Sequence, residues 1–122
     1  MKLLLDTHVL LWALLDDPRL SEAQARAIGE GDLYLSAASV WEIGIKRAIG
    51  KLDLPDGIFD VARDAGCRPL PITWRHAETA AALPPRHSDP FDRMLIAQAI
   101  CEGLTLLSSD AKFRDYEVDL IG

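Results

Sequence analysis

The amino-acid sequence predicts an α/β protein with three layers, α/β/α, around a central and mostly parallel sheet of about four or five strands. Short apolar runs alternate with stretches of helical apolar periodicity along almost the whole chain. Strands that alternate with helices form parallel sheets, because each crossover helix returns the chain to the same end of the sheet. The 122 residues contain no linker, repeat or low-complexity segment, so residues 1–122 are expected to form a single domain.

In the first half of the chain, several local signals fix where the expected elements begin and end. The sequence DDP at 16–18 stops the first helix, and Ser21 with Gln24 has the spacing of a capping box. Gly29 is expected to end that second helix. The elements expected here are a strand at 2–5, helices at 8–15 and 21–28, a strand at 33–35, and a helix from Ser36 to about residue 49.

The second half of the chain continues the alternation and is divided by prolines. Pro84 and Pro85 break a helical pattern, and Asp89 followed by Pro90 marks the start of the next helix. The expected elements are helices at 55–65, 73–83 and 90–102, strands at 68–72 and 105–108, and a last edge strand at 118–121.

Composition and charge narrow the class of protein. The net charge of −6 argues against a basic nucleic-acid surface, although divalent cations bound to clustered acids would weaken that objection. The longest apolar run, residues 9–15, is too short to cross a bilayer, so a soluble cytoplasmic protein without membrane contact is expected. Cys67 and Cys101 lack the spacing of zinc ligands and are expected to be free thiols.

Four acidic residues occupy the positions where a chemical site would be built. Asp6 ends the first strand and Asp110 follows the strand at 105–108. Ligands of open α/β sheets bind beyond the carboxyl ends of the strands, which is the edge where these two acids belong. Glu42 and Asp92 lie within helical patterns. If all four meet in space, they form a metal pocket.

The two helical acids are predicted to face the core. Asp92 shares a helix face with Leu95, Ile96 and Ala99, and Glu42 shares one with apolar residues at positions 45 and 49. Burying an unpaired carboxylate lowers the free energy of unfolding by roughly several kcal/mol, whereas an exposed ion pair raises it by less than about 1 kcal/mol. A bound cation would resolve this conflict.

Each acid also has a structural explanation of its own. Asp6 and Asp110 both fit the N-cap of the turn that follows them. Glu42 precedes Lys46 by four residues, the spacing of a helical ion pair. Asp92 is the third helical residue after the Asp89 cap, a variant of the capping box.

Four sequence blocks together resemble a known family. They are LLDTH at 4–8, SVWEI at 39–43, DPFDR at 89–93 and LLSSD at 106–110. In this order and spacing the chain closely resembles the PIN-domain ribonucleases, and in particular the VapC-type toxins of bacterial toxin–antitoxin pairs. The resemblance spans essentially the whole chain and implies a PIN-like fold.

The resemblance implies a metal-dependent RNA endonuclease. Asp6, Glu42, Asp92 and Asp110 match the acidic positions that hold Mg²⁺ or Mn²⁺ in the family, and hard cations prefer such carboxylate oxygens. Without metal the carboxylates would repel one another, so at least one should have a raised pKa. Further contacts to the ligand acids or to substrate are expected from residues near the four blocks, namely Thr7, Ser109, Asp89, Lys46 and Arg93.

The resemblance also implies partners. An RNA substrate, a cognate antitoxin that presents an Arg or Lys to the acids, and a homodimer or larger toxin–antitoxin assembly are expected. The apolar stretches around Trp12 and Leu14 and around Trp41, Ile45 and Ile49 are the surfaces proposed for these contacts, or else ordinary core.

The histidines give no signal of a zinc site, and two other functions are compatible with the sequence. The histidines at 8, 76 and 87 lack zinc-site spacing, and His87 is expected to be an exposed loop residue. One rival function is a carboxylate-metal DNA nuclease or a phosphatase, although the Asp-x-Asp pair of an aspartyl-phosphate enzyme is missing after the first strand. The other is a non-catalytic interaction module with the same fold.

Overall fold

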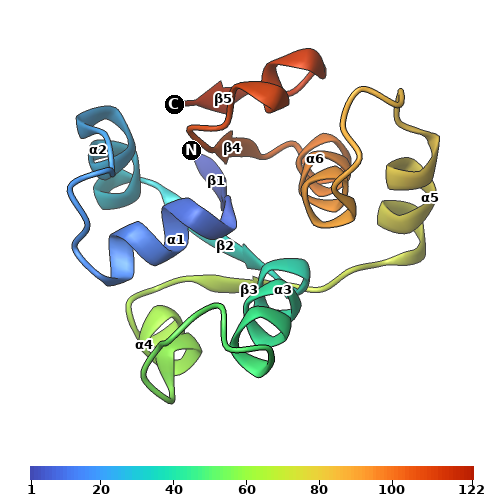
Figure 1. Ribbon diagram of the computed structural model, residues 1–122. Helices are drawn as coiled ribbons and strands as arrows, with labels where there is room; N and C mark the ends of the chain where they lie inside the picture. Colours follow the sequence, from blue (N-terminus) through green and yellow to red (C-terminus); the bar gives the residue numbers. More distant parts are fainter.

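The centre of the molecule is a five-stranded sheet in which every pair of neighbouring strands is parallel (Figure 1). A computed structural model describes residues 1–122. The strands are β1 (Lys2–Leu5), β2 (Asp32–Ser36), β3 (Arg68–Leu70), β4 (Thr105–Leu107) and β5 (Leu120–Ile121). Their spatial order is β3-β2-β1-β4-β5, so the predicted α/β class and the edge position of the last strand are confirmed.

The strand order reverses at β1, which positions the site. From β1 the chain builds outward through β2 to β3, and it then crosses back to add β4 on the other side of β1. Leu4 pairs with Tyr34 of β2 and with Leu106 of β4. The reversal therefore places the carboxyl ends of β1 and β4 beside each other, where ligands of parallel α/β sheets bind.

Helices cover both faces of this sheet (Figure 1). They are α1 (Thr7–Leu14), α2 (Glu22–Glu30), α3 (Ala37–Ala48), α4 (Ile58–Asp64), α5 (Trp74–Ala82) and α6 (Pro90–Glu102), with a 3₁₀ helix η1 at Ala111–Asp115. None of the helices has the length and apolar character needed to span a membrane.

The core consists of two buried clusters, because alternate residues of a strand point to opposite faces. Leu3 and Leu5 pack with residues of α1, α3 and α4, whereas Leu4 packs with α6 and with Phe113 of η1. The continuous apolar run of β1 is thus explained by burial on both faces, as expected for the central strand of a parallel sheet.

The boundaries of the elements agree with those predicted from the sequence within two residues, except for the start of α4. The prediction that Gly29 ends α2 was wrong, because the helix continues to Glu30 and Gly31 follows it. A Cβ at Gly31 would lie 2.5 Å from Leu3 Cδ1 and 3.0 Å from Ala27 O, so any larger residue would force the buried Leu3 side chain of β1 to shift. The start of α4 is Ile58 rather than residue 55, because Gly57 precedes it with a φ of +77°.

Candidate active site

The first part of the site is the junction of β1 and β4. The backbone N–H of Asp6 donates to Leu107 O at 2.9 Å, and Ser108 Oγ donates to Asp6 Oδ2 at 2.8 Å. Asp6 is 3% exposed and takes the N-cap position of α1, yet its side chain makes no capping hydrogen bond. The capping explanation therefore does not account for this carboxylate.

The second part of the site is contributed by α3, where Glu42 is buried beside α1. Thr7 Oγ1 donates to Glu42 Oε1 at 2.8 Å, and Lys46 Nζ lies 3.1 Å from Glu42 Oε2. Thr7 is therefore beside the acids as expected, and the predicted helical ion pair with Lys46 is present as well. The predicted core face of this helix was wrong, because Ile49 is 61% exposed and the buried residues are Ala38, Ser39, Glu42 and Ile43.

The third part of the site is formed by α6, the loop before it and η1. His87 Nε2 lies 2.8 Å from Asp92 Oδ2. One ligand atom each from His87, Asp92 and Asp110 lie within 4.8 Å of one another, an arrangement that can hold a metal ion. Asp89 caps α6 by accepting from the N–H groups of Phe91 and Asp92, which separates its role from that of Asp92.

His87 is the functional candidate that the sequence analysis underestimated. The expectation of an exposed loop residue was wrong, because its side chain is 6% exposed and points to Asp92. Nothing in the spacing of the histidines signals this contact, since the loop at 83–89 has no regular structure from which a direction could be deduced.

The pKa values of Asp6 and Asp92 are shifted by burial and by the charges of neighbouring acids. Burial raises the pKa of Asp92 to about 6, with further increases from the charges of Asp89 and Asp6 and an opposing effect of His87. Burial also raises the pKa of Asp6, where the Ser108 hydrogen bond opposes it and the charge of Glu42 adds to it. The charge of Asp6 thus acts on Asp92 and that of Glu42 acts on Asp6, whereas the ligand atoms that lie within 4.8 Å of one another come from His87, Asp92 and Asp110, without Asp6 or Glu42.

Asp110, the N-cap residue of η1, also has a local role. Asp110 Oδ1 accepts from the backbone N–H of Lys112 at 2.9 Å, and the N–H of Asp110 donates to Ser108 Oγ at 3.1 Å. The predicted cap is real, but it engages one oxygen only. The carboxylate still lies within the cluster with His87 and Asp92.

Two residues expected near the acids have other contacts. Ser109 is exposed and accepts from Gln24 Nε2 at 2.9 Å, so Ser108 rather than Ser109 supplies the hydroxyl beside Asp6. Arg93 directs its guanidinium to the carbonyl oxygens of the turn between α5 and α6, namely those of Ala80, Leu83, Pro84 and His87. That guanidinium holds the turn together and makes no hydrogen bond to an acid.

The donor set fits a hard divalent cation. Carboxylate oxygens predominate, the single imidazole is the only nitrogen donor of the cluster, and no thiol is part of it. Both cysteines are free, as the sequence predicted. Burial raises the pKa of both Asp6 and Asp92, and a bound cation would favour their ionised forms.

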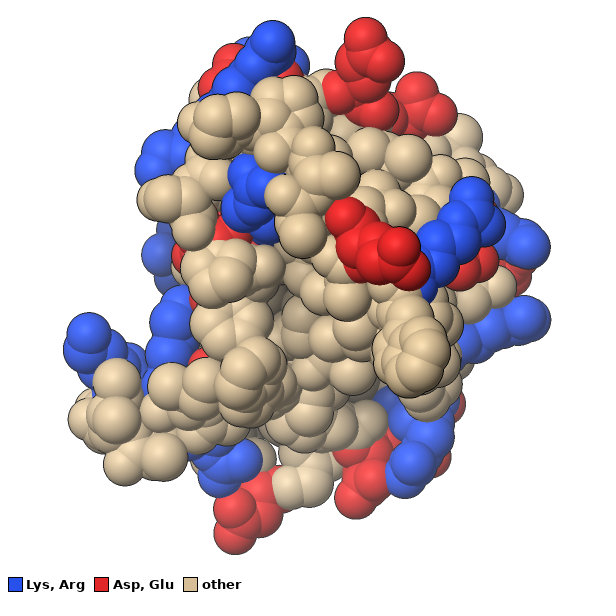
Figure 2. Space-filling model, turned by 90° about the vertical axis from the view of Figure 1, so that its right-hand side faces the viewer, with Lys and Arg blue, Asp and Glu red and all other residues tan.

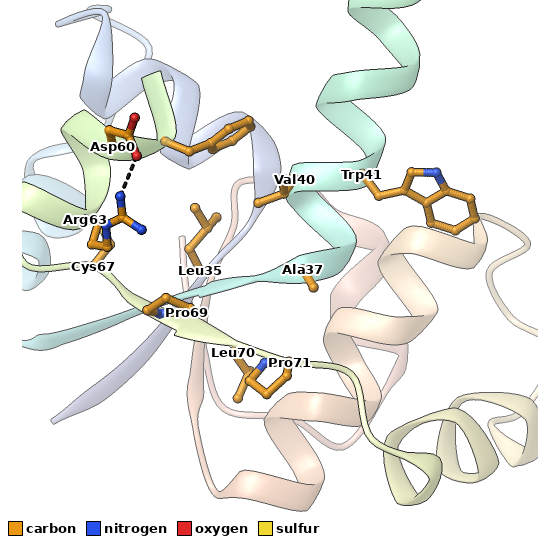
Figure 3. Close-up of a pocket in the computed structure, with 11 residues that line it drawn as sticks. Leu35, Ala37, Val40, Trp41, Asp60, Arg63, Cys67, Pro69, Leu70 and Pro71 are labelled. Atoms are coloured by element: carbon orange, nitrogen blue, oxygen red, sulfur yellow. Dashed lines mark hydrogen bonds and ion pairs between the residues drawn. The ribbon is translucent and has the colours of Figure 1, made fainter. Parts of the chain in front are cut away.

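An apolar groove, shown in Figure 3, is lined by none of these acids. It has a volume of about 520 Å³ and lies between α3, α4 and the edge strand β3. Leu35 and Pro69 belong to its floor, and the Asp60–Arg63 ion pair lies at its rim. The groove lacks converging polar groups, so it suits an apolar partner surface rather than the chemistry of the acids.

Comparisons with known proteins agree with this geometry. A model of the PIN domain matches residues 3–119. Ribonuclease VapC22 from Mycobacterium tuberculosis is 34% identical, over 93% of this chain and 90% of its own length.

Two solved structures share the fold: VapBC2 from Rickettsia felis, bound to a DNA fragment of its promoter, and FitAcB from Neisseria gonorrhoeae. The first has a TM-score of 0.75, 15% identity and coverage of 99% of this chain and 98% of that chain. The second has a TM-score of 0.68, 24% identity and coverage of 98% and 96%. The chain therefore belongs to the PIN domain family.

Proposed function

We propose that this protein is a metal-dependent endoribonuclease and the toxin component of a toxin–antitoxin pair. The observation that carries the proposal is a group of acids near the ends of β1 and β4, in which Asp92 and Asp110 offer ligand atoms within 4.8 Å of each other and the charge of Asp6 acts on Asp92. The charge of Glu42 in turn acts on Asp6. The relative with 34% identity is a VapC ribonuclease, and this supports RNA as the substrate. Cytoplasmic RNA would be within reach of a protein without a membrane-spanning helix.

The roles of the side chains follow from their hydrogen bonds. The chemistry supplied by bound Mg²⁺ or Mn²⁺ is the activation of water and the stabilisation of charge on the phosphodiester group. Asp6, Glu42, Asp92 and Asp110 are the acids that would hold the ion: Asp92 and Asp110 offer oxygens to one cluster, and the charge of Glu42 acts on Asp6. Ser108 fixes the orientation of Asp6, and Thr7 fixes that of Glu42. Hydrogen bonds of this kind orient ligand carboxylates and raise the affinity for metal.

We infer that the protein forms a homodimer through the exposed apolar residues of α3 and α5. Trp41 is 65% exposed and Trp74 is 89% exposed. Figure 2 shows the face on the α5 side, where a broad uncharged area is bordered by charges of both signs. Exposed aromatic residues in such a setting are typical of protein interfaces. The stretch around Trp12 and Leu14, by contrast, packs against the core.

An antitoxin is proposed as the second partner. The VapBC2 and FitAcB structures share the fold, and a further neighbour with a TM-score of 0.70 is a toxin–antitoxin complex from Klebsiella pneumoniae. The acidic pocket offers carboxylates to an Arg or Lys of such a partner. The apolar groove between α3, α4 and β3, which Trp41 also lines, provides a surface outside the acidic pocket for an apolar segment.

Cleavage assays test the proposed activity against its rivals. Purified protein with Mn²⁺ or Mg²⁺ is expected to cut structured RNA and to leave duplex DNA and a generic phosphomonoester intact. Asp92→Asn should abolish cleavage, whereas Glu78→Gln, which changes an exposed acid of α5, should not. Cleavage of DNA or of the phosphomonoester would favour the other enzyme classes. Inactivity on all three, with folded and metal-bound protein, would favour an interaction module.

A further inference from the structure

We propose that His87 is a positioning residue that holds Asp92 in the orientation needed to bind metal. This inference rests on the proposed metal site. His87 Nε2 lies 2.8 Å from Asp92 Oδ2, and both side chains are largely buried, at 6% and 17% exposure. An ionised carboxylate only accepts hydrogen bonds, so Nε2 carries the proton and donates. The contact engages Oδ2 and leaves Oδ1 of Asp92 without a protein donor.

Both the backbone and the ring of His87 are held in place by neighbouring residues. The carbonyl oxygen of His87 accepts from Arg93 Nη1 at 3.2 Å, which fixes the backbone of the loop. The ring meets Phe113 of η1 edge to face, with centroids 6.2 Å apart and an angle of 80° between planes. Phe113 is 1% exposed and belongs to the core cluster of that face. The direction of the Nε2–H group is therefore determined by packing rather than by the loop alone.

Asp92 needs such a donor because its other neighbours oppose its charge. Burial, Asp89 and Asp6 all disfavour the ionised form, and His87 is the side chain that donates to this carboxylate. Phe113 also connects the imidazole to η1, the element that begins at the Asp110 cap. The histidine thus links the two acids of the cluster and maintains their spacing.

The second buried histidine of the chain has a different kind of environment. His76 Nδ1 accepts from the backbone N–H of Thr73 at the start of α5, and its Nε2 lies 2.8 Å from Glu102. Glu102 is 45% exposed and lies at the end of α6. His76 therefore stabilises a helix start and a helix pair, whereas His87 points to an acid of the proposed site.

Metal binding by single variants tests the positioning role without relying on catalysis. Mn²⁺ dissociation constants are measured by calorimetry or by electron paramagnetic resonance at pH 7. His87→Ala is expected to weaken Mn²⁺ binding by about 10- to 100-fold, the usual effect of removing a hydrogen bond that orients a ligand. His87→Met, which fills more of the space beside Phe113 without a donor, should weaken it equally.

His87→Gln is the rescue variant. The amide nitrogen of glutamine is separated from Cα by as many bonds as Nε2 of histidine, so it can donate to Asp92 Oδ2. Its Mn²⁺ affinity should return to within about threefold of the unchanged protein. Arg86→Gln controls for disturbance of the loop, because this exposed guanidinium contacts only Asp115 O. Circular dichroism verifies that each variant is folded.

Two results would overturn the positioning role. Unchanged Mn²⁺ affinity in His87→Ala and His87→Met would show that the contact is irrelevant to metal. Equal weakness of His87→Gln and His87→Ala would show that the imidazole binds the ion directly. The proposed ribonuclease activity is judged separately by RNA cleavage of the unchanged protein, so its failure is distinguishable from failure of this inference.

Discussion

The hydroxyl of Ser108 donates to Oδ2 of Asp6 at 2.8 Å and joins two residues that are 102 positions apart in the chain. The bond crosses from the end of β4 to the end of β1, the neighbouring strands at the reversal of strand order. It supplies a donor to a carboxylate that is 3% exposed. The same oxygen of Ser108 accepts from the backbone N–H of Asp110, so one hydroxyl connects two acids of the site.

Replacing this hydroxyl should destabilise the protein and weaken metal binding. We expect Ser108→Ala to lower the free energy of unfolding by about 1–3 kcal/mol, because a buried carboxylate loses its donor. Urea denaturation measures this change. Ser109→Ala is the matched control and should have a smaller effect, since Ser109 is exposed and contacts Gln24 instead of an acid. The reverse ranking would show that Ser109 is the hydroxyl of the site.

Stability without metal should depend on pH through Asp92. Its pKa is raised from the ordinary value of 3.8 to about 6, so the folded state binds more protons than the unfolded state between these values. Stability must therefore fall as pH rises from about 4 to 6. The increase in the pKa of Asp92 corresponds to a loss of about 3 kcal/mol in the free energy of unfolding, and solvent screening reduces this loss to about 1–2 kcal/mol.

Asp92→Asn tests the sign of this effect. The variant should be more stable than the unchanged protein at pH 7 in the presence of a chelator, and the two should converge near pH 4. Denaturation curves at pH 4, 5, 6 and 7 provide the comparison. If Asp92→Asn is instead less stable at pH 7, the carboxylate contributes to folding and its charge is not a source of repulsion.

The sequence was sufficient for most of the elements because they depend on local pattern, and the four acids stay predicted site residues. Helical periodicity, the Ser21–Gln24 capping box and the Asp89–Pro90 helix start all act within a few residues, and the structure confirms them. The acids were identified by their position after strands and on helices. Their convergence would follow from the strand order, which alternation of strands and helices implies only in part.

The contacts missed by the sequence analysis all depend on tertiary packing. Ser108 and Ser109 are adjacent and chemically equal, so only the direction of β4 decides which hydroxyl reaches Asp6. The core face of α3 was misjudged because the helix ends at Ala48, so that Ile49 is its exposed C-cap residue and not part of the buried face. His87 lies in a loop, where no periodicity predicts the direction of a side chain.

Arg93 is expected to be a structural residue and not a substrate contact. Its guanidinium donates to four carbonyl oxygens at the end of α5 and in the turn between α5 and α6. A lysine ammonium cannot make the same set of hydrogen bonds. Arg93→Lys should lower the free energy of unfolding by about 2–3 kcal/mol. Arg75→Lys, on the exposed side of α5, is the control and should have almost no effect. If the Arg93→Lys protein is as stable as the unchanged protein but no longer cleaves RNA, Arg93 contacts the substrate instead.

Addition and removal of metal should change stability in a pH-dependent way. A ligand that binds only the folded state at 100 times its dissociation constant stabilises by about 2.7 kcal/mol. Mn²⁺ should therefore raise the melting temperature at pH 7, and a chelator should reverse the shift. The shift should be smaller at pH 5, because protons compete for Asp6 and Asp92, whose pKa values are raised. Asp92→Asn should lose most of it at both pH values. An equal shift at pH 5 and 7, retained in Asp92→Asn, would place the bound ion outside the acidic site.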